Sequence, residues 1–336
     1  MDMRATARAM VAPGKGILAA DESTGTIQKR FDMIDVTSTV ETRRAYRELL
    51  FTTESAEQHI GGVILFDGTI RQQSSDGTPF AEVIAGKGIV PGIKVDMGAK
   101  DLPASPGETV TEGLDGLRQR LAEYHELGAR FAKWRAVIRI GPDVPTWNSV
   151  KANAHALARY AALCQEADIV PIVEPEVLMD GDHTIERSYE VTRWVLRTTF
   201  SELADAGVRL DSMVLKPNMV IPGSDYPQRA EPEEVAEMTV RCLNEELPVA
   251  VPGVAFLSGG QSELEATANL NAMNVSGDHP WALSFSYGRA LQQSALKAWV
   301  GESANVAAAQ AAFLHRATMN GLATNGGWSP DMETES

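Results

Sequence analysis

Short apolar segments alternate with longer amphipathic segments along most of the chain, and this alternation limits the possible folds more than any other feature. The short segments are rich in Val, Ile, Ala and Phe, a composition typical of strands buried on both faces. Eight of them occur, at residues 16–21, 61–67, 90–96, 129–135, 170–176, 211–217, 254–260 and 282–288. Strands that alternate with helices in this way predict a series of parallel βαβ units.

The intervening segments have helical periodicity. Leu114, Leu117, Leu121 and Tyr124 recur at spacings of three and four residues, which places them on one face of a helix over 113–129. The same pattern predicts helices at 42–53, 150–167, 189–207 and 232–247.

Eight βα units can close into a TIM (β/α)8 barrel, and a length of 336 residues suits one. An open, doubly wound sheet is the alternative, but eight is a natural number of strands for closure. We therefore expect an α/β fold with a single TIM-barrel catalytic domain over residues 1–327. Residues 328–336 combine Gly, Pro and acidic residues with little apolar content beyond Trp328, which predicts a flexible, disordered acidic tail.

Composition excludes several classes of protein. A net charge of −15 argues against nucleic-acid binding, which requires a basic surface. No apolar run approaches the length of a membrane span, and the first residues lack the apolar core of a signal peptide. Cys164 and Cys242 stand far apart among apolar neighbours, so we expect buried free thiols and a cytoplasmic protein.

Charged residues gather at the ends of the predicted strands. Residues two apart on a strand share a face, and three strands end in such charged pairs: Lys94 with Asp96, Lys133 with Arg135, and Glu174 with Glu176. Two further strands end in Asp21 and Lys216. A single charge at a strand end is most simply a surface residue. Several at the same end of one barrel predict an active site, because TIM-barrel active sites lie at the C-terminal ends of the strands.

Cations outnumber anions at this predicted mouth, although the chain as a whole is acidic. The seven cations are Lys29, Arg30, Lys94, Lys133, Arg135, Lys216 and Arg289, against the four anions Asp21, Asp96, Glu174 and Glu176. This excess predicts an anionic small-molecule substrate, with phosphate as the favoured anion. The glycines of "SGG" (258–260) and "YGR" (287–289) follow strands seven and eight, where TIM barrels commonly bind phosphate. Lys29 and Arg30 indicate either a second anion site or a solvated helix start.

Lys216 ends an apolar strand, and a buried ammonium must find a partner or give up its proton. With a cation such as Lys133 beside it, a lysine loses its proton more readily and can form a Schiff base with a ketone. Glu174 or Glu176 can then transfer protons. The six histidines form no metal-binding motif, and "GKGILA" (14–19) precedes a strand where a dinucleotide motif would follow one. We therefore expect neither a metal nor another cofactor.

Eight motifs in chain order resemble those of class I fructose-bisphosphate aldolases. They span residue 16 to about residue 300 and read "ILAADESTGT", "GGVILFDGT", "GIKVDMG", "FAKWR", "VPIVEPE", "LKPNMV", "FLSGGQSE" and "FSYGRALQ". The resemblance implies a glycolytic, metal-independent lyase that reversibly cleaves fructose 1,6-bisphosphate into dihydroxyacetone phosphate and glyceraldehyde 3-phosphate. It also implies a homotetramer.

The resemblance assigns roles to individual residues. It implies that Lys216 forms the Schiff base, that Glu174 is the acid/base, and that Asp21, Lys133 and Glu176 are their charge partners. It places one phosphate on Ser258, Gly259, Gly260, Ser286, Gly288 and Arg289. It places the other end of the sugar on Ser23, Arg30 and Lys94, with Lys29 a further candidate, and Arg135 is expected among the substrate-binding cations.

Three departures from the family pattern are visible. Thr26 replaces a serine and keeps its hydroxyl, Met97 stands where many relatives have lysine, and the chain lacks the terminal tyrosine of animal members. The last departure puts a catalytic role of the tail in doubt. Two alternatives stay open on the sequence alone: a non-catalytic binding scaffold, and a Schiff-base aldolase for a different sugar phosphate. The preference between the 1,6-bisphosphate and the 1-phosphate also stays open.

Overall fold

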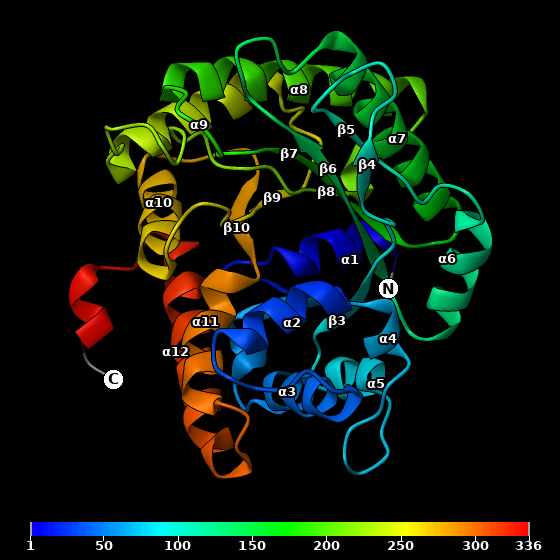
Figure 1. Ribbon diagram of the computed structural model, residues 1–336, viewed down its shortest axis with the longest axis vertical. Helices are drawn as coiled ribbons and strands as arrows, with labels where there is room; N and C mark the ends of the chain where they lie inside the picture. The colour runs from blue at the N-terminus through cyan, green and yellow to red at the C-terminus, as the bar shows by residue number, and fades with distance from the viewer. Residues whose placement is uncertain (1, 335–336) are drawn as a thin grey trace.

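The structure, a computed structural model that describes residues 2–334, contains a closed barrel of eight parallel strands (Figure 1). The barrel strands are β1 (Gly16–Ala20), β2 (Ile60–Leu65), β3 (Val90–Lys94), β6 (Phe131–Ile138), β7 (Val170–Val177), β8 (Val214–Leu215), β9 (Gly253–Phe256) and β10 (Ala282–Tyr287). Each strand pairs with its neighbours in this order, and β10 closes the barrel onto β1 through Ile17 and Ser286. The predicted TIM barrel is confirmed, and each barrel strand overlaps one of the eight predicted segments.

Helices surround the barrel (Figure 1). They are α1 (Met3–Met10), α2 (Thr24–Asp32), α3 (Val40–Thr52), α4 (Asp67–Ile70), α5 (Phe80–Gly86), α6 (Leu117–Glu126), α7 (Trp147–Glu166), α8 (Ile185–Asp205), α9 (Pro232–Glu246), α10 (Glu263–Val275), α11 (Arg289–Trp299) and α12 (Val306–Ala323). None of the described helices has the length and apolar content needed to span a bilayer. Cys164 and Cys242 are buried and unpaired, as expected.

Helix α1 closes one end of the barrel. Its Met10 belongs to an apolar cluster with Phe131, Val170 and Val214, each of which lies at the start of a strand. The Phe131 ring fills the barrel so closely that a Cβ on Gly92 would lie 2.3 Å from it. The N-terminal end of the barrel is therefore packed with side chains, which leaves the C-terminal end for a site.

Two features differ from the sequence-based expectations in the strands. An unpredicted antiparallel hairpin joins β4 (Ala99–Asp101) to β5 (Thr109–Thr111). These strands are short and mostly exposed, so they lack the apolar run that identified the barrel strands. Strand β8 is also shorter than predicted, because a 3-10 turn over Leu210–Ser212 replaces its start and Pro217 lacks an N–H for the ladder at its end. The backbone N–H of Lys216 still donates to the carbonyl of Val173, at 2.8 Å.

The predicted disorder of the tail does not extend to residues 328–334. The Trp328 backbone N–H donates to Asn271 Oδ1 at 3.0 Å, and its indole N–H donates to Glu333 Oε1 at 2.9 Å. Glu333 also forms an ion pair with Arg316, and its Oε2 lies 3.0 Å from His315 Nε2. Composition predicted disorder because it does not register such specific polar contacts. Residues 335 and 336 of the predicted tail lie outside the described residues.

Candidate active site

A cavity of about 670 Å³ opens at the C-terminal ends of the barrel strands. Each site residue that we selected from the sequence contributes to its wall: Asp21, Ser23, Lys29, Arg30, Lys94, Asp96, Lys133, Arg135, Glu174, Glu176, Lys216, Ser258, Gly259, Gly260, Ser286, Gly288 and Arg289. The closed barrel brings these residues together because every strand contributes its C-terminal end to the same mouth.

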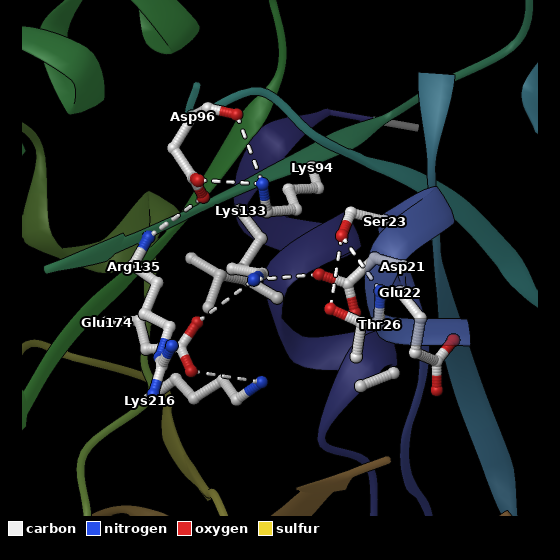
Figure 2. Close-up of polar contacts among 12 residues, drawn as sticks. Asp21, Glu22, Ser23, Thr26, Lys94, Asp96, Lys133, Arg135, Glu174 and Lys216 are labelled. Carbon is white, nitrogen blue, oxygen red and sulfur yellow. Dashed lines mark hydrogen bonds and ion pairs between the residues drawn. The ribbon is translucent and has the colours of Figure 1, made fainter. Parts of the chain in front are cut away.

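Four charges of alternating sign, three of them buried and Asp21 nearly so, form a chain on the floor of the cavity (Figure 2). Lys216 Nζ lies 3.3 Å from Glu174 Oε1, and Lys133 Nζ lies 3.4 Å from Glu174 Oε2. Lys133 Nζ also lies 2.7 Å from Asp21 Oδ2. The side chains of Lys216, Glu174 and Lys133 are at most 5% exposed. Two ammonium groups thus balance two carboxylates in a site that is almost closed to water.

The position of Glu174 changes one expectation. The sequence predicted that Lys133 is the neighbour of Lys216, but Glu174 lies between them and contacts both (Figure 2). The strand order explains this arrangement, since β7, which carries Glu174, lies between β6 with Lys133 and the end of β8 with Lys216.

The cluster controls the protonation of two of its members. Burial acts to raise the pKa of Asp21, but the ammonium groups of Lys133 and Lys216 outweigh it and hold that pKa below its ordinary value. Burial acts to lower the pKa of Lys133, but the carboxylates of Asp21 and Glu174 outweigh it and raise that pKa. Asp21 is therefore a carboxylate and Lys133 an ammonium at neutral pH.

A second set of charges lines the adjoining wall. Lys94 Nζ lies 2.7 Å from Asp96 Oδ1, and the other Asp96 oxygen accepts from the Arg135 backbone N–H at 3.3 Å. The Arg135 guanidinium pairs with Glu176. The sequence indicated Asp96 only as an anion at a strand end, and the structure shows that it holds Lys94 at the cavity wall.

The glycine-rich loops after β9 and β10 form the opposite side. Gly260 has φ +75°, and a Cβ there would lie 2.3 Å from Met179 Cγ, so only glycine fits. The Ser286 hydroxyl is buried without a hydrogen-bond partner among the described residues. Helix α11 begins at Arg289 without a side-chain cap, which leaves backbone N–H groups of its first turn available to an anion. These features suit a phosphate.

The remaining cations lie on α2. Ser23 caps this helix by accepting from the Thr26 N–H at 3.3 Å, and Lys29 is exposed at the rim. Arg30 is ion-paired with Glu22, a residue that the pattern of strand ends did not identify. Glu22 follows the end of β1 and points away from the lysines, so the search for charges at the ends of the predicted strands did not include it (Figure 2).

The described residues 2–334 contain no group of three or more His, Cys, Asp or Glu side chains arranged to hold a metal ion.

Comparisons with known proteins show similarity over the whole chain. A family model described as fructose-bisphosphate aldolase class-I matches residues 2–336. A probable fructose-bisphosphate aldolase class 1 from Xanthomonas campestris is 59% identical over 324 residues, covering 96% of this chain and 97% of the relative. The cytosolic fructose-bisphosphate aldolase 4 of Arabidopsis thaliana is 54% identical over 333 residues, covering 99% of this chain and 85% of the relative.

A solved structure has the same fold. It is a fructose-bisphosphate aldolase from Plasmodium falciparum, in a ternary complex with TRAP and a small-molecule inhibitor. The two chains superpose with a TM-score of 0.96 at 49% sequence identity, over 97% of this chain and 95% of the other. The matches extend over the whole barrel rather than over single motifs. This chain belongs to the class I fructose-bisphosphate aldolase family.

Proposed function

We propose that this chain reversibly cleaves fructose 1,6-bisphosphate into dihydroxyacetone phosphate and glyceraldehyde 3-phosphate through a Schiff base on Lys216. The observation that carries the proposal is the contact between Lys216 Nζ and Glu174 Oε1, 3.3 Å apart on the floor of a cavity rich in cations. A buried amine beside a carboxylate has both a nucleophile and a proton carrier for imine formation. A non-catalytic scaffold has no need of these costly interior charges.

The reaction requires four steps. Lys216 first gives a proton to Glu174, and the neutral amine then attacks the substrate ketone. The carbinolamine loses water when Glu174 returns that proton to the leaving hydroxyl. The resulting iminium withdraws the electron pair of the C3–C4 bond as that bond breaks, while a carboxylate accepts the proton of the C4 hydroxyl. The aldehyde leaves, and an enamine stays bound to Lys216. Protonation of the enamine carbon and hydrolysis of the imine then release dihydroxyacetone phosphate and restore the amine.

Lys133 and Asp21 support these steps electrostatically. The Lys133 ammonium contacts both Glu174 and Asp21, so it holds the two carboxylates together on the floor of the cavity. Because Asp21 and Lys133 keep their charges at neutral pH, the site is organised before the substrate arrives. The glycine-rich loops on one side and Arg30 with Lys94 on the other provide one anion site for each end of a bisphosphate.

We expect full cleavage activity after exhaustive chelation. An imine supplies the electron sink that a metal-dependent aldolase obtains from a Lewis acid. The assay follows triose phosphate formation from fructose 1,6-bisphosphate after dialysis against EDTA, with a zinc-supplemented sample as the control. Activity that disappears in EDTA and returns with zinc would contradict the Schiff-base proposal. If the untreated enzyme cleaves another sugar phosphate but not fructose 1,6-bisphosphate, the proposed substrate is wrong and the Schiff-base mechanism is not affected.

We expect Arg289→Ala to raise KM for fructose 1,6-bisphosphate far more than Lys29→Ala. Arg289 follows Gly288 at the start of α11, where its guanidinium can bind a phosphate through two hydrogen bonds, and loss of such a pair costs on the order of tenfold to a hundredfold in affinity. Lys29 is an exposed point charge, which contributes little. Steady-state kinetics of both variants give the comparison. Equal increases in KM would show that the phosphate sites are assigned incorrectly.

We further propose a cytoplasmic homotetramer. The family resemblance supports the oligomeric state, and the cytosolic name of the Arabidopsis relative supports the location. Light scattering of the purified chain, with a mass near four times that of one chain, and fractionation of the source cells are the measurements that decide these two points.

A further inference from the structure

Glu22 is a buried carboxylate beside the catalytic cluster but outside it. Asp21 faces Lys133, whereas the next residue, Glu22, points away from the lysines toward the surrounding helices (Figure 2). Its side chain is 4% exposed. Such a carboxylate is costly to bury unless it is paired.

Three side chains from three helices satisfy Glu22. Oε1 pairs with Arg30 of α2 and accepts a hydrogen bond from Gln292 Nε2 of α11 at 3.0 Å. Oε2 pairs with Arg47 of α3, whose side chain is 3% exposed. These four residues, Glu22, Arg30, Arg47 and Gln292, are called the Glu22 hub below.

Gln292 connects the Glu22 hub to the barrel. Its Nε2 also donates to the Ala19 carbonyl of β1 at 2.7 Å, and its Oε1 lies 3.4 Å from Arg47 Nη1. Gln292 lies one turn into α11, the helix that begins at Arg289. The Glu22 hub therefore ties the end of β1 to the helix whose first turn faces the glycine-rich loops.

Arg30 is the member of the Glu22 hub that a substrate in the cavity can contact. A Cβ on Gly288 would lie 3.3 Å from Arg30 Nη2, so the guanidinium rests against the glycine that precedes Arg289. The Arg30 side chain is 20% exposed and contributes to the cavity wall. Glu22 thus holds a cation that a substrate phosphate can reach.

The charges of the Glu22 hub do not cancel. One carboxylate faces two guanidinium groups, so the Glu22 hub carries one surplus positive charge. Arg47 is buried behind Glu22 and is not among the described residues that line the cavity, so it cannot contact a substrate itself. Its guanidinium, with that of Arg30, overcomes the effect of burial and holds the pKa of Glu22 below its ordinary value, which keeps Glu22 ionised.

We propose that Arg47 and Glu22 are positioning residues for phosphate binding: Glu22 places Arg30 against Gly288, and Arg47 neutralises Glu22 so that Arg30 can turn its charge to a substrate phosphate. When Arg47 is absent, Arg30 and Glu22 form an ion pair with no net charge. A phosphate must then compete with the Glu22 carboxylate for Arg30. This inference rests on the proposed function, because it assigns Arg30 to the phosphate of that substrate.

Three variants test the role of the charge. Arg47→Met leaves Arg30 and Glu22 as a neutral pair, and Arg47→Lys restores the charge. Glu22→Gln/Arg47→Met leaves Arg30 as the single charge, and the amide oxygen of the glutamine can still accept a hydrogen bond that positions Arg30. The matched control is Arg44→Met on the same helix, since Arg44 pairs with Glu41 and Glu48 and not with the Glu22 hub. The measurements are kcat and KM for fructose 1,6-bisphosphate, with the competitive inhibition constant of inorganic phosphate.

We expect Arg47→Met to raise KM and the phosphate inhibition constant about tenfold, with kcat within about threefold of wild type, because ground-state binding alone is weakened. Arg47→Lys and the double variant should return KM to within about threefold of wild type, and Arg44→Met should not change it. If Arg47 only stabilised the fold, the double variant, which lacks the charges of both Glu22 and Arg47, would not recover the wild-type KM.

An unchanged KM in Arg47→Met would overturn the proposal, as would a double variant with KM as high as that of Arg47→Met. If Arg47→Met does not fold, Arg47→Gln, which also removes the charge, is measured against the same limits, with Arg30→Met as the reference for complete loss of the cation. If wild type does not cleave fructose 1,6-bisphosphate, the proposed function fails. Binding of inorganic phosphate to the same variants, measured by calorimetry, then tests the Glu22 hub alone.

Discussion

Replacing Lys216 with Met will reduce kcat for fructose 1,6-bisphosphate by on the order of 10⁴-fold or more, because the substitution removes the nucleophile. Methionine has a similar length and no charge, so it fills the same buried space without leaving an unpaired ammonium. Glu174 keeps its contact with Lys133 in this variant, so we expect the protein to fold. The measurements are steady-state cleavage and the melting temperature, with Lys297→Met on the exposed face of α11 as the control.

Chemical trapping tests the same assignment without a substitution. Borohydride added with dihydroxyacetone phosphate reduces the imine to a stable secondary amine, which inactivates the enzyme and marks the modified peptide. We expect the mass increase on the peptide that contains Lys216. A label on Lys94 or Lys133, with Lys216 unmodified, would show that another lysine is the nucleophile.

Replacing Glu174 with Gln will lower kcat by roughly 10² to 10⁴-fold, the usual contribution of a general acid/base. Glutamine keeps the shape of the side chain but cannot accept and return a proton. The substitution also changes the four-charge cluster from neutral to a net charge of +1, which does not oppose the binding of an anionic substrate. We therefore expect KM to stay near the wild-type value or fall, and borohydride trapping to become slower.

Glu176→Gln is the comparison for this experiment, because both glutamates were candidates for the acid/base role. Glu176 pairs with Arg135 at the wall, whereas Glu174 contacts Lys216 directly. We expect the smaller loss of kcat in Glu176→Gln. A Glu174→Gln enzyme with kcat within about fivefold of wild type would remove Glu174 from proton transfer. A larger loss of kcat in Glu176→Gln than in Glu174→Gln would show that Glu176 is the acid/base.

The barrel and the charged pairs at the C-terminal ends of its strands were predictable, because both depend on the spacing of residues along short segments. Strands buried on both faces need continuous apolar runs, and these identified each barrel strand. Side chains two apart share a face, and this spacing alone groups Lys133 with Arg135 and Glu174 with Glu176. The cavity wall contains all four.

Several other features were not predictable in this way. Helix α1 buries Met3, Ala7 and Met10 at helical spacing but is only eight residues long, and the short β4–β5 hairpin has no apolar run. The places of both depend on packing against distant strands. The described part of the tail is held by the contact of Glu333 with Arg316, which composition cannot reveal. Pro217 ended β8 early, although the hydrogen bond of the Lys216 N–H preserved the position of the nucleophile.

The sequence by itself determined the fold class and the end of the barrel that carries the site, because both follow from the spacing of residues along the strands. The same spacing predicted the charged pairs at that end, whereas the serines of the expected phosphate sites came from the family resemblance. The tertiary structure alone decided which charges touch. It placed Glu174 between Lys133 and Lys216, and it brought Arg47 and Gln292 onto Glu22 from distant helices. Coulombic and hydrogen-bond energies depend on separations of a few ångströms, and only the closure of the barrel and the packing of its helices set those separations.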